Sequence, residues 1–294
     1  MNRGTKAMNR NYDKIMNLHG VEEIKQLVKK WDVLSGNISN TFSKSGIVLP
    51  DLFWVINSGV GRTKMLNLLA EYLYSKGNLI DFYGNQKYFE FLLNYCPKDQ
   101  EFHEIQRLME TSKNAAGFRN EFRGIVCVDI DEWIEHYREK HFIAFLEMLA
   151  SKSKDWLIVL CVQEYNEDKI RALYAHLSMY LRLERVNLKM PSSEELLEYV
   201  KQKLSEHELY ISEKDQEKMF LTIEKLRTSE QFDGFKTLIM LCQDIVYEHF
   251  CEEDAVKGEI SEKVMDKFTV DSDYVKKLLY TFEKKYQIGF EAGK

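Results

Sequence analysis

The stretch FWVINSGVGRTKML, residues 53–66, predicts a buried strand, a glycine-containing turn and a helix in succession. The strand is predicted from the apolar residues that end at Ile56, and the turn from Gly59 and Gly61. Glycine allows backbone conformations and close approaches that other residues resist. A strand, a turn and a helix in this order begin a unit of a parallel α/β fold.

The same stretch has the residue types that bind phosphate. Glycines let backbone N–H groups approach phosphate oxygens, and the N-terminus of the following helix adds its positive end. A basic side chain reaches the outer phosphates, and a hydroxyl ligates magnesium. The residues expected to contact nucleotide here are Ser58, Gly59, Val60, Gly61, Arg62, Thr63 and Lys64, with Thr63 on the metal.

Two positions depart from the usual phosphate-loop pattern GxxxxGK[ST]. Ile56 stands at the place of the first glycine, and Arg62 at the place of the lysine. Arginine keeps the positive charge but has a larger, planar head. An ordinary strand, turn and helix with a pair of glycines is therefore the alternative interpretation of this loop.

A second stretch, GIVCVDIDEW at residues 124–133, is an apolar strand that ends in carboxylates. An aspartate at a strand end can hold magnesium, and a neighbouring glutamate can polarise the attacking water. We assign Asp131 and Glu132 to these roles. Asp129 is the competing aspartate, because the apolar run 125–128 also precedes it. An acidic helix start is the structural alternative, since carboxylates favour that position.

Apolar runs alternate with amphipathic stretches through the first two thirds of the chain. This alternation predicts a parallel sheet covered by helices on both faces. Residues 1–12 are polar and are expected to be frayed, residues 20–31 predict a helix, and residues 35–46 predict a loop. The predicted strands are 52–56, 79–83, 125–128, 157–162 and 183–188, and the helices between them are 63–76, 87–95, 101–113, 133–151 and 167–179.

The pattern changes after Pro191, where no strand is predicted. Ser192 and Glu195 form a capping box that opens a helix, and further helices are expected at 214–227, 235–250 and 260–286. The predicted domains are an N-terminal tail and linker helix at 1–46, an α/β nucleotide-binding core at 47–190 and an all-helical subdomain at 191–294.

Composition excludes several classes of protein. The net charge is −6, which argues against nucleic acid as a partner because such proteins usually carry a basic face. The apolar runs are too short to cross a bilayer, and the N-terminus lacks the apolar stretch of a signal peptide. The five cysteines are scattered without a CxxC pair, which favours reduced thiols in a cytoplasmic protein over zinc ligands.

Taken together, the two motifs resemble the Walker A and Walker B motifs of AAA+ ATPases, and the resemblance extends over most of the chain. Residues 20–25, GVEEIK, resemble the segment that precedes the phosphate loop in this family. Residues 156–163 resemble the fourth core strand, with Gln163 near the sensor 1 position. Arg182 resembles the arginine finger that acts on a neighbouring subunit, and Arg185 is a second candidate. Lys236 lies near the sensor 2 position.

The resemblance implies a five-stranded parallel sheet in the order 5-1-4-3-2, followed by a helical lid that begins at PSSEEL, residues 191–196. It implies ATP and Mg²⁺ as cofactors, and hydrolysis that remodels or regulates a partner protein within a homo-oligomeric ring. The rubisco-activase-like and sporulation-type subgroup is the most similar. A degenerate, non-hydrolysing scaffold is the alternative, and a DNA-associated loader is a third possibility that the acidic balance disfavours.

Residues 87–89, KYF, follow the second predicted strand, where many AAA+ rings place an aromatic pore loop that grips a polypeptide. The opposing interpretation is that this segment is an amphipathic helix whose buried face consists of Tyr88, Phe89, Phe91, Leu92 and Tyr95.

Overall fold

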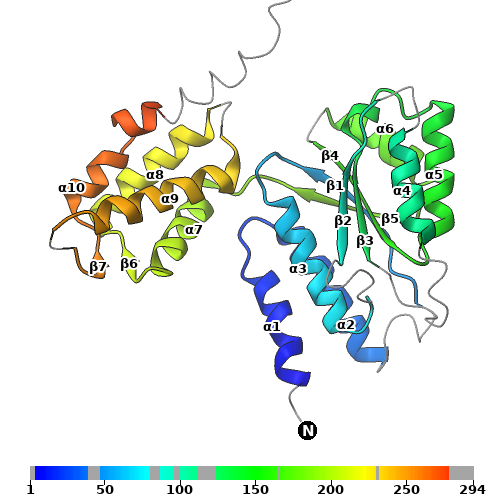
Figure 1. The fold of residues 1–294 in the computed structure, drawn as a ribbon, viewed down its shortest axis with the longest axis horizontal. Coiled ribbons are helices and arrows are strands. Elements are labelled where there is room, and N and C mark those ends of the chain that lie inside the picture. Colours follow the sequence, from blue (N-terminus) through cyan, green and yellow to red (C-terminus); the bar gives the residue numbers. More distant parts are fainter. Residues whose placement is uncertain are drawn as a thin grey trace, which may run out of the picture. The chain divides into compact units, whose positions relative to one another are not determined.

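The computed structural model describes residues 4–38, 47–79, 87–95, 100–111, 124–163, 166–229, 232–253 and 255–277. The chain forms two compact units (Figure 1). The α/β unit comprises Met1–Asn57 and Arg62–Lys189, and the helical unit comprises Ser58–Gly61 and Met190–Lys294. The four residues of the glycine turn therefore group with the helical unit, although the strand before them and the helix after them do not.

The α/β unit is built on one parallel sheet, as the alternation of apolar runs predicts. The strand order is β2-β3-β4-β1-β5, which is the predicted order 5-1-4-3-2 read from the other edge. The strands are β1 Asp51–Ile56, β2 Tyr88–Leu92, β3 Ile125–Asp129, β4 Leu157–Gln163 and β5 Leu183–Leu188.

Helices cover both faces of this sheet. In Figure 1, α1, α2 and α3 lie on one side of it, and α4, α5 and α6 on the other. β1 and the first six residues of β4 are buried throughout, which explains why these strands read as continuous apolar runs. The helices are α1 Gly4–Met16, α2 Glu22–Ile38, α3 Arg62–Ser75, α4 Gln100–Thr111, α5 Lys140–Lys152 and α6 Glu167–Leu177.

The second strand was predicted at the wrong place. The strand is β2, Tyr88–Leu92, within the segment 87–95 that was predicted as a helix. Residues 80–83 of the predicted strand lie outside the described residues. The sequence YFEFL satisfies both periodicities, and aromatic residues favour a half-buried edge strand. Tyr88 and Phe89 therefore belong to the sheet, so a pore loop at 87–89 is ruled out in its predicted form.

Three further predictions need correction: a frayed tail, a loop and a helix. Residues 4–16 form α1, in which Ile15 is buried, so this part of the chain is a helix instead of a frayed tail. The predicted loop at 35–46 begins later, because α2 continues to Ile38. The predicted helix 133–151 is divided into a short 3-10 turn, η2 Asp131–Trp133, and α5, because buried Trp133 and Ile134 hold the intervening turns against the core.

The helical unit contains the predicted helix starts, but it is not all-helical as predicted, because β6 and β7 form a short parallel pair. Ser192 accepts a hydrogen bond from the N–H of Glu195 and the Glu195 carboxylate accepts one from the N–H of Ser192, as the capping box predicts. The elements are α7 Ser193–Ser205, β6 Leu209–Tyr210, α8 Glu213–Arg227, α9 Gly234–Phe250, β7 Gly258–Glu259, α10 Glu262–Met265 and η3 Asp266–Phe268. The predicted helix 260–286 is interrupted at Thr269, whose backbone is extended.

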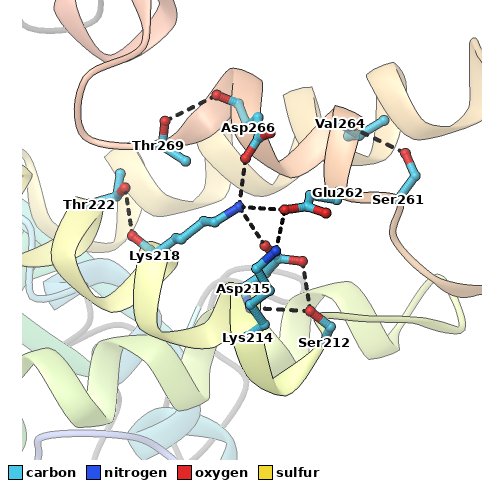
Figure 2. A network of polar contacts seen from close by, with 10 residues as sticks. All are labelled: Ser212, Lys214, Asp215, Lys218, Thr222, Ser261, Glu262, Val264, Asp266 and Thr269. Atoms are coloured by element: carbon cyan, nitrogen blue, oxygen red, sulfur yellow. Dashed lines mark hydrogen bonds and ion pairs between the residues drawn. The ribbon is translucent and has the colours of Figure 1, made fainter.

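A charged network connects α8 with α10 and η3 in this unit (Figure 2). The ammonium group of Lys218 lies 3.1 Å from Asp215, 3.4 Å from Glu262 and 2.7 Å from Asp266. Ser212 caps α8 by accepting the N–H of Asp215 and donates its hydroxyl to the Asp215 carboxylate. We call Lys218 and its three carboxylates the Lys218 network. In the described part of the chain, no helix has the length and apolar character needed to cross a membrane.

Candidate nucleotide site

The N-terminus of α3 follows directly after the glycine turn. α3 begins at Arg62, so Arg62 and Thr63 occupy its first turn, and the Thr63 side chain is exposed. The first four N–H groups of a helix have no partner within the helix. These groups and the positive end of the helix can therefore bind an anion.

The turn before α3 is held by backbone contacts inside the helical unit. The carbonyl of Gly59 accepts a hydrogen bond of 3.0 Å from the N–H of Phe235, in the first turn of α9. Ser58 donates its hydroxyl to Asp233 at 3.4 Å. Gly59 has φ 74° and Gly234 has φ 52°, and a Cβ on Gly59 would lie 2.4 Å from the carbonyl carbon of Asp233. Only glycine fits both positions without strain.

Arg62 binds two carboxylates from neighbouring strands. Its Nη1 donates to Oδ2 of Asp129 at 2.6 Å, and its Nε donates to Oε2 of Glu90 at 3.2 Å. Asp129 ends β3, and Glu90 lies in β2. We call Arg62, Glu90 and Asp129 the Arg62 cluster. This cluster brings the first turn of α3 next to the strand-end carboxylate of the second motif.

The strand register explains why these groups meet. Glu90 pairs with Cys127, and Asp129 pairs with Cys161. Side chains of paired residues, and of residues two apart in one strand, point to the same face of a sheet. Both carboxylates therefore share a face with two buried thiols, whose Sγ atoms are 3.2 Å apart.

The electrostatics of the cluster favour the charged form of Arg62. Burial alone would lower the pKa of its guanidinium, but the hydrogen bond to Asp129 and the nearby negative charge raise that pKa above its ordinary value. Burial, together with the hydrogen bond and charge of Cys127, raises the pKa of the Cys161 thiol well above its usual range.

Asp131 and Glu132 lie in η2, just beyond β3, and both accept backbone hydrogen bonds. Oδ1 of Asp131 accepts the N–H of Gln163 at 2.6 Å, and Oε2 of Glu132 accepts the N–H of Tyr95 at 2.6 Å. The N–H of Asp131 donates to Oδ1 of Asp129 at 3.2 Å. Of the two competing aspartates, Asp129 is the one that contacts Arg62.

The remaining predicted residues have other surroundings. Gln163 ends β4, and its side chain is exposed. Arg182 precedes β5 and donates to the carbonyl of Val48 at 3.3 Å. Arg185 forms a two-point contact with Glu167 at 2.8 and 2.9 Å. Lys236 in α9 is 71 % exposed and lies 3.4 Å from Asp233.

Two residues near the site, Glu90 and Tyr95, were not predicted from the sequence as functional residues. Glu90 lies in the middle of YFEFL, and a lone carboxylate between aromatic residues of a half-buried strand is the signal that could have found it. Tyr95 acts through its main chain, while its ring stacks on His136 with centroids 4.0 Å apart. A backbone contact of this kind leaves no mark in the sequence.

Known structures of similar fold exist for most of the chain. One single-residue variant of RuvB, the Holliday junction branch migration motor of Thermotoga maritima, is 14 % identical, with a TM-score of 0.50, and the match covers 90 % of this chain and 78 % of that one. Another variant of the same protein is 14 % identical with a TM-score of 0.51, covering 94 % and 80 %. Neither a family model nor a curated protein matches the sequence. At this identity the likeness concerns the fold, which is the AAA+ fold that the resemblance implied.

Proposed function

We propose that the chain is an AAA+-type protein that binds ATP with Mg²⁺ and hydrolyses it to remodel or regulate a partner protein. The observation that carries this proposal is the contact between Arg62, at the start of α3, and Asp129, at the end of β3. This contact supports a site in which the N–H groups of the helix and the Arg62 cation bind the phosphates. The strand-end carboxylate would bind the magnesium ion of the same nucleotide. In this proposal, residues 47–190 are the nucleotide-binding core and residues 191–294 are the lid.

Within this proposal, Thr63 and Asp129 would hold the magnesium ion. Thr63 has an exposed hydroxyl in the first turn of α3, and Asp129 has a carboxylate at the carboxyl end of β3. Oxygen ligands of these two kinds are the ones that magnesium prefers. Asp131, the aspartate first assigned, is held instead through the N–H of Gln163. Bound magnesium would supply positive charge to the phosphates during phosphoryl transfer.

Glu132 would then act as the base that polarises water. The residue directly after Asp129 is Ile130, whose side chain is fully buried, so no carboxylate is available at that position. Glu132 is exposed, and the Tyr95 N–H orients its carboxylate.

The other residues expected to contact nucleotide are part of this proposal. Backbone N–H groups would come from Ser58, Gly59, Val60 and Gly61. Side-chain contacts to the nucleotide would come from Lys64, Gln163 and Lys236. Arg182 would act on the nucleotide of a neighbouring subunit. We propose a homo-oligomer in the cytoplasm that acts on a partner protein. The charge of the whole chain does not exclude a local basic surface, so nucleic acid is a second class of partner to test.

A second candidate function is a nucleotide-responsive regulatory module that does not hydrolyse ATP. The observation that favours it is that Arg62 is already paired with two carboxylates. Ile130 also favours this function, because it occupies the position directly after Asp129 and leaves no carboxylate there to activate water.

Turnover of Glu132→Gln separates the two candidates. ATP binding and phosphate release are measured for the parent protein, for Glu132→Gln and for the matched control Glu135→Gln. Glu135 is an exposed carboxylate near Glu132 in the sequence, and it pairs with Lys169. If the chain is an ATPase, Glu132→Gln binds ATP but loses turnover by about 100-fold or more, while the control keeps both. Binding without turnover in all three proteins would favour the regulatory module. Absence of binding in all three would contradict both functions.

A further inference from the structure

We propose that Glu90 competes with nucleotide phosphates for Arg62, so that it limits nucleotide affinity and favours ligands with several phosphates. This inference rests on the proposed nucleotide site. It assigns a role to a residue of the edge strand β2 that lies in neither phosphate-binding motif. The argument depends on the geometry, the charge and the local position of the Arg62 cluster.

The geometry leaves Arg62 committed to two partners. Its Nε and Nη1 atoms donate to Glu90 at 3.2 Å and to Asp129 at 2.6 Å. Guanidinium donors lie in a planar fork, which matches carboxylate or phosphate oxygens with equal ease. The donors that bind the two carboxylates are therefore of the kind that phosphate oxygens would use.

The charges of the cluster make this competition strong. One cation and two carboxylates sum to a net charge of −1, which repels a polyanion. The side chains are only 33 % exposed for Arg62, 24 % for Glu90 and 13 % for Asp129, so water and salt screen them less than surface groups. Asp129 is fixed further by the N–H of Asp131, whereas Glu90 has the longer of the two contacts to Arg62. Glu90 is thus the partner that phosphate displaces more easily.

The position of Arg62 supports the same conclusion. A cation in the first turn of a helix is disfavoured by the positive end of the helix. Nearby carboxylates relieve this conflict in the free protein, and phosphate groups would relieve it in the bound protein. A triphosphate brings more negative charge than a monophosphate, so it should displace Glu90 more effectively.

The test measures nucleotide affinity in Glu90→Gln and in a matched control. The amide keeps the shape of the side chain but loses the charge that holds Arg62. Glu71→Gln is the control, because Glu71 pairs with Lys87 at 2.7 Å and also joins α3 to the β2 segment. Binding of a fluorescent ATP analogue with Mg²⁺ is followed by anisotropy, with ATP and AMP as competitors.

We expect Glu90→Gln to lower the Kd for ATP by about ten-fold, the effect of releasing one partly screened charged partner. The Kd for AMP divided by the Kd for ATP should become smaller in this variant. Glu71→Gln should bind both nucleotides with the affinities of the parent protein. Glu90→Asp, which shortens the side chain, should act in the same direction and replaces Glu90→Gln if a melting curve shows that the amide variant does not fold.

An unchanged or weaker affinity in the Glu90 variants would overturn the proposal while leaving the proposed function intact, provided that the parent protein binds ATP. The same tightening in Glu71→Gln would also overturn it, because the effect would then be one of general charge. If neither the parent nor any Glu90 variant binds ATP, the proposed function itself fails and this inference fails with it.

Discussion

Arg62 in the α/β unit and Lys218 in the helical unit are both cations bound by more than one carboxylate, but their local settings are opposite. In the Lys218 network, Asp215 and Glu262 lie in the first turns of α8 and α10, where negative charge is favourable. Lys218 follows Asp215 by three residues and lies against it. Arg62 is itself in the first turn of a helix, and its carboxylates come from strands.

This difference teaches how to separate structural charge from functional charge. The Lys218 network satisfies every local preference, so fold stability is enough to explain it. The Arg62 cluster places a cation where the helix disfavours it. Departures from local rules concentrate at functional sites, because an additional ligand resolves the conflict there. We therefore expect variants in the two clusters to have different consequences.

The largest effect is expected at the glycine turn, where the positive φ and the close backbone approach at Gly59 require glycine. Gly59→Ala should lower the free energy of unfolding by about 2–4 kcal/mol, since it combines a disfavoured positive φ with a backbone clash. Chemical denaturation followed by circular dichroism measures it. Gly36→Ala is the control, because a Cβ there meets no atom within 4 Å. Equal stability of Gly59→Ala and the parent would show that the turn does not pack against Asp233 and Gly234.

Arg62→Ala should raise the Kd for ATP by about 100-fold, because a charged contact to phosphate is lost. The melting temperature should also fall, because the change leaves the partly buried carboxylates of Glu90 and Asp129 without their cation. Titration of a fluorescent ATP analogue measures the affinity. Lys218→Ala is the matched comparison, for which we expect a lower melting temperature with unchanged affinity. Unchanged affinity in Arg62→Ala would place the nucleotide elsewhere.

Asp51 provides a pH test of the α/β unit. It lies at the start of β1, is 4 % exposed and accepts the N–H of Ile158 at 2.9 Å. Burial raises its pKa from 3.8 to about 7, and the hydrogen bond from Ile158 opposes this only in part. A raised carboxyl pKa means that the folded state holds the proton longer than the unfolded state, so stability falls as pH rises from about 4 to about 7.

The expected loss across this pH window is about 2 kcal/mol after allowance for relaxation of the buried site. Urea unfolding at several pH values measures it. Asp51→Asn keeps an oxygen that can accept the Ile158 N–H but does not ionise, so its stability should vary less with pH. A parent protein that gains stability over this range would contradict the raised pKa.

The smallest effect is expected for Asp215→Ala. This change removes one side of the Ser212 capping interaction and one carboxylate of the Lys218 network, and it should cost about 1 kcal/mol of stability. Thermal unfolding measures the cost, and ATP affinity should not change. Glu213→Ala, in the same turn but outside the network, is its control. A loss of nucleotide affinity in Asp215→Ala would remove the contrast between the two clusters.

Most of the fold could be predicted from the sequence because local and global signals agree there. β1, β3 and β4 consist of continuous apolar runs that are buried along almost their whole length, and the capping box at Ser192 marks the start of α7. β2 was predicted at the wrong place because its five residues fit two periodicities. No local rule decides between them, and pairing with β3 decides it in the folded chain.

The candidate site could be predicted only in part. Gly59, Arg62 and Thr63 stand out because a phosphate loop is a local pattern in sequence. The contact between Arg62 and Glu90 depends on strand register across 28 residues, which a motif does not encode. The contact that distinguishes Asp129 from Asp131, the hydrogen bond from Arg62, also depends on how the strands pair, since both aspartates follow apolar runs.

The assignment of Ser58–Gly61 to the helical unit has a consequence for dividing the chain into fragments. The main chain passes from one unit to the other after Asn57, returns after Gly61 and crosses again after Lys189. Neither unit is therefore one continuous segment of the sequence. A fragment that begins at Met190 would lack Gly59, whose carbonyl accepts the N–H of Phe235. A fragment that ends at Lys189 would keep Ser58–Gly61 without these partners.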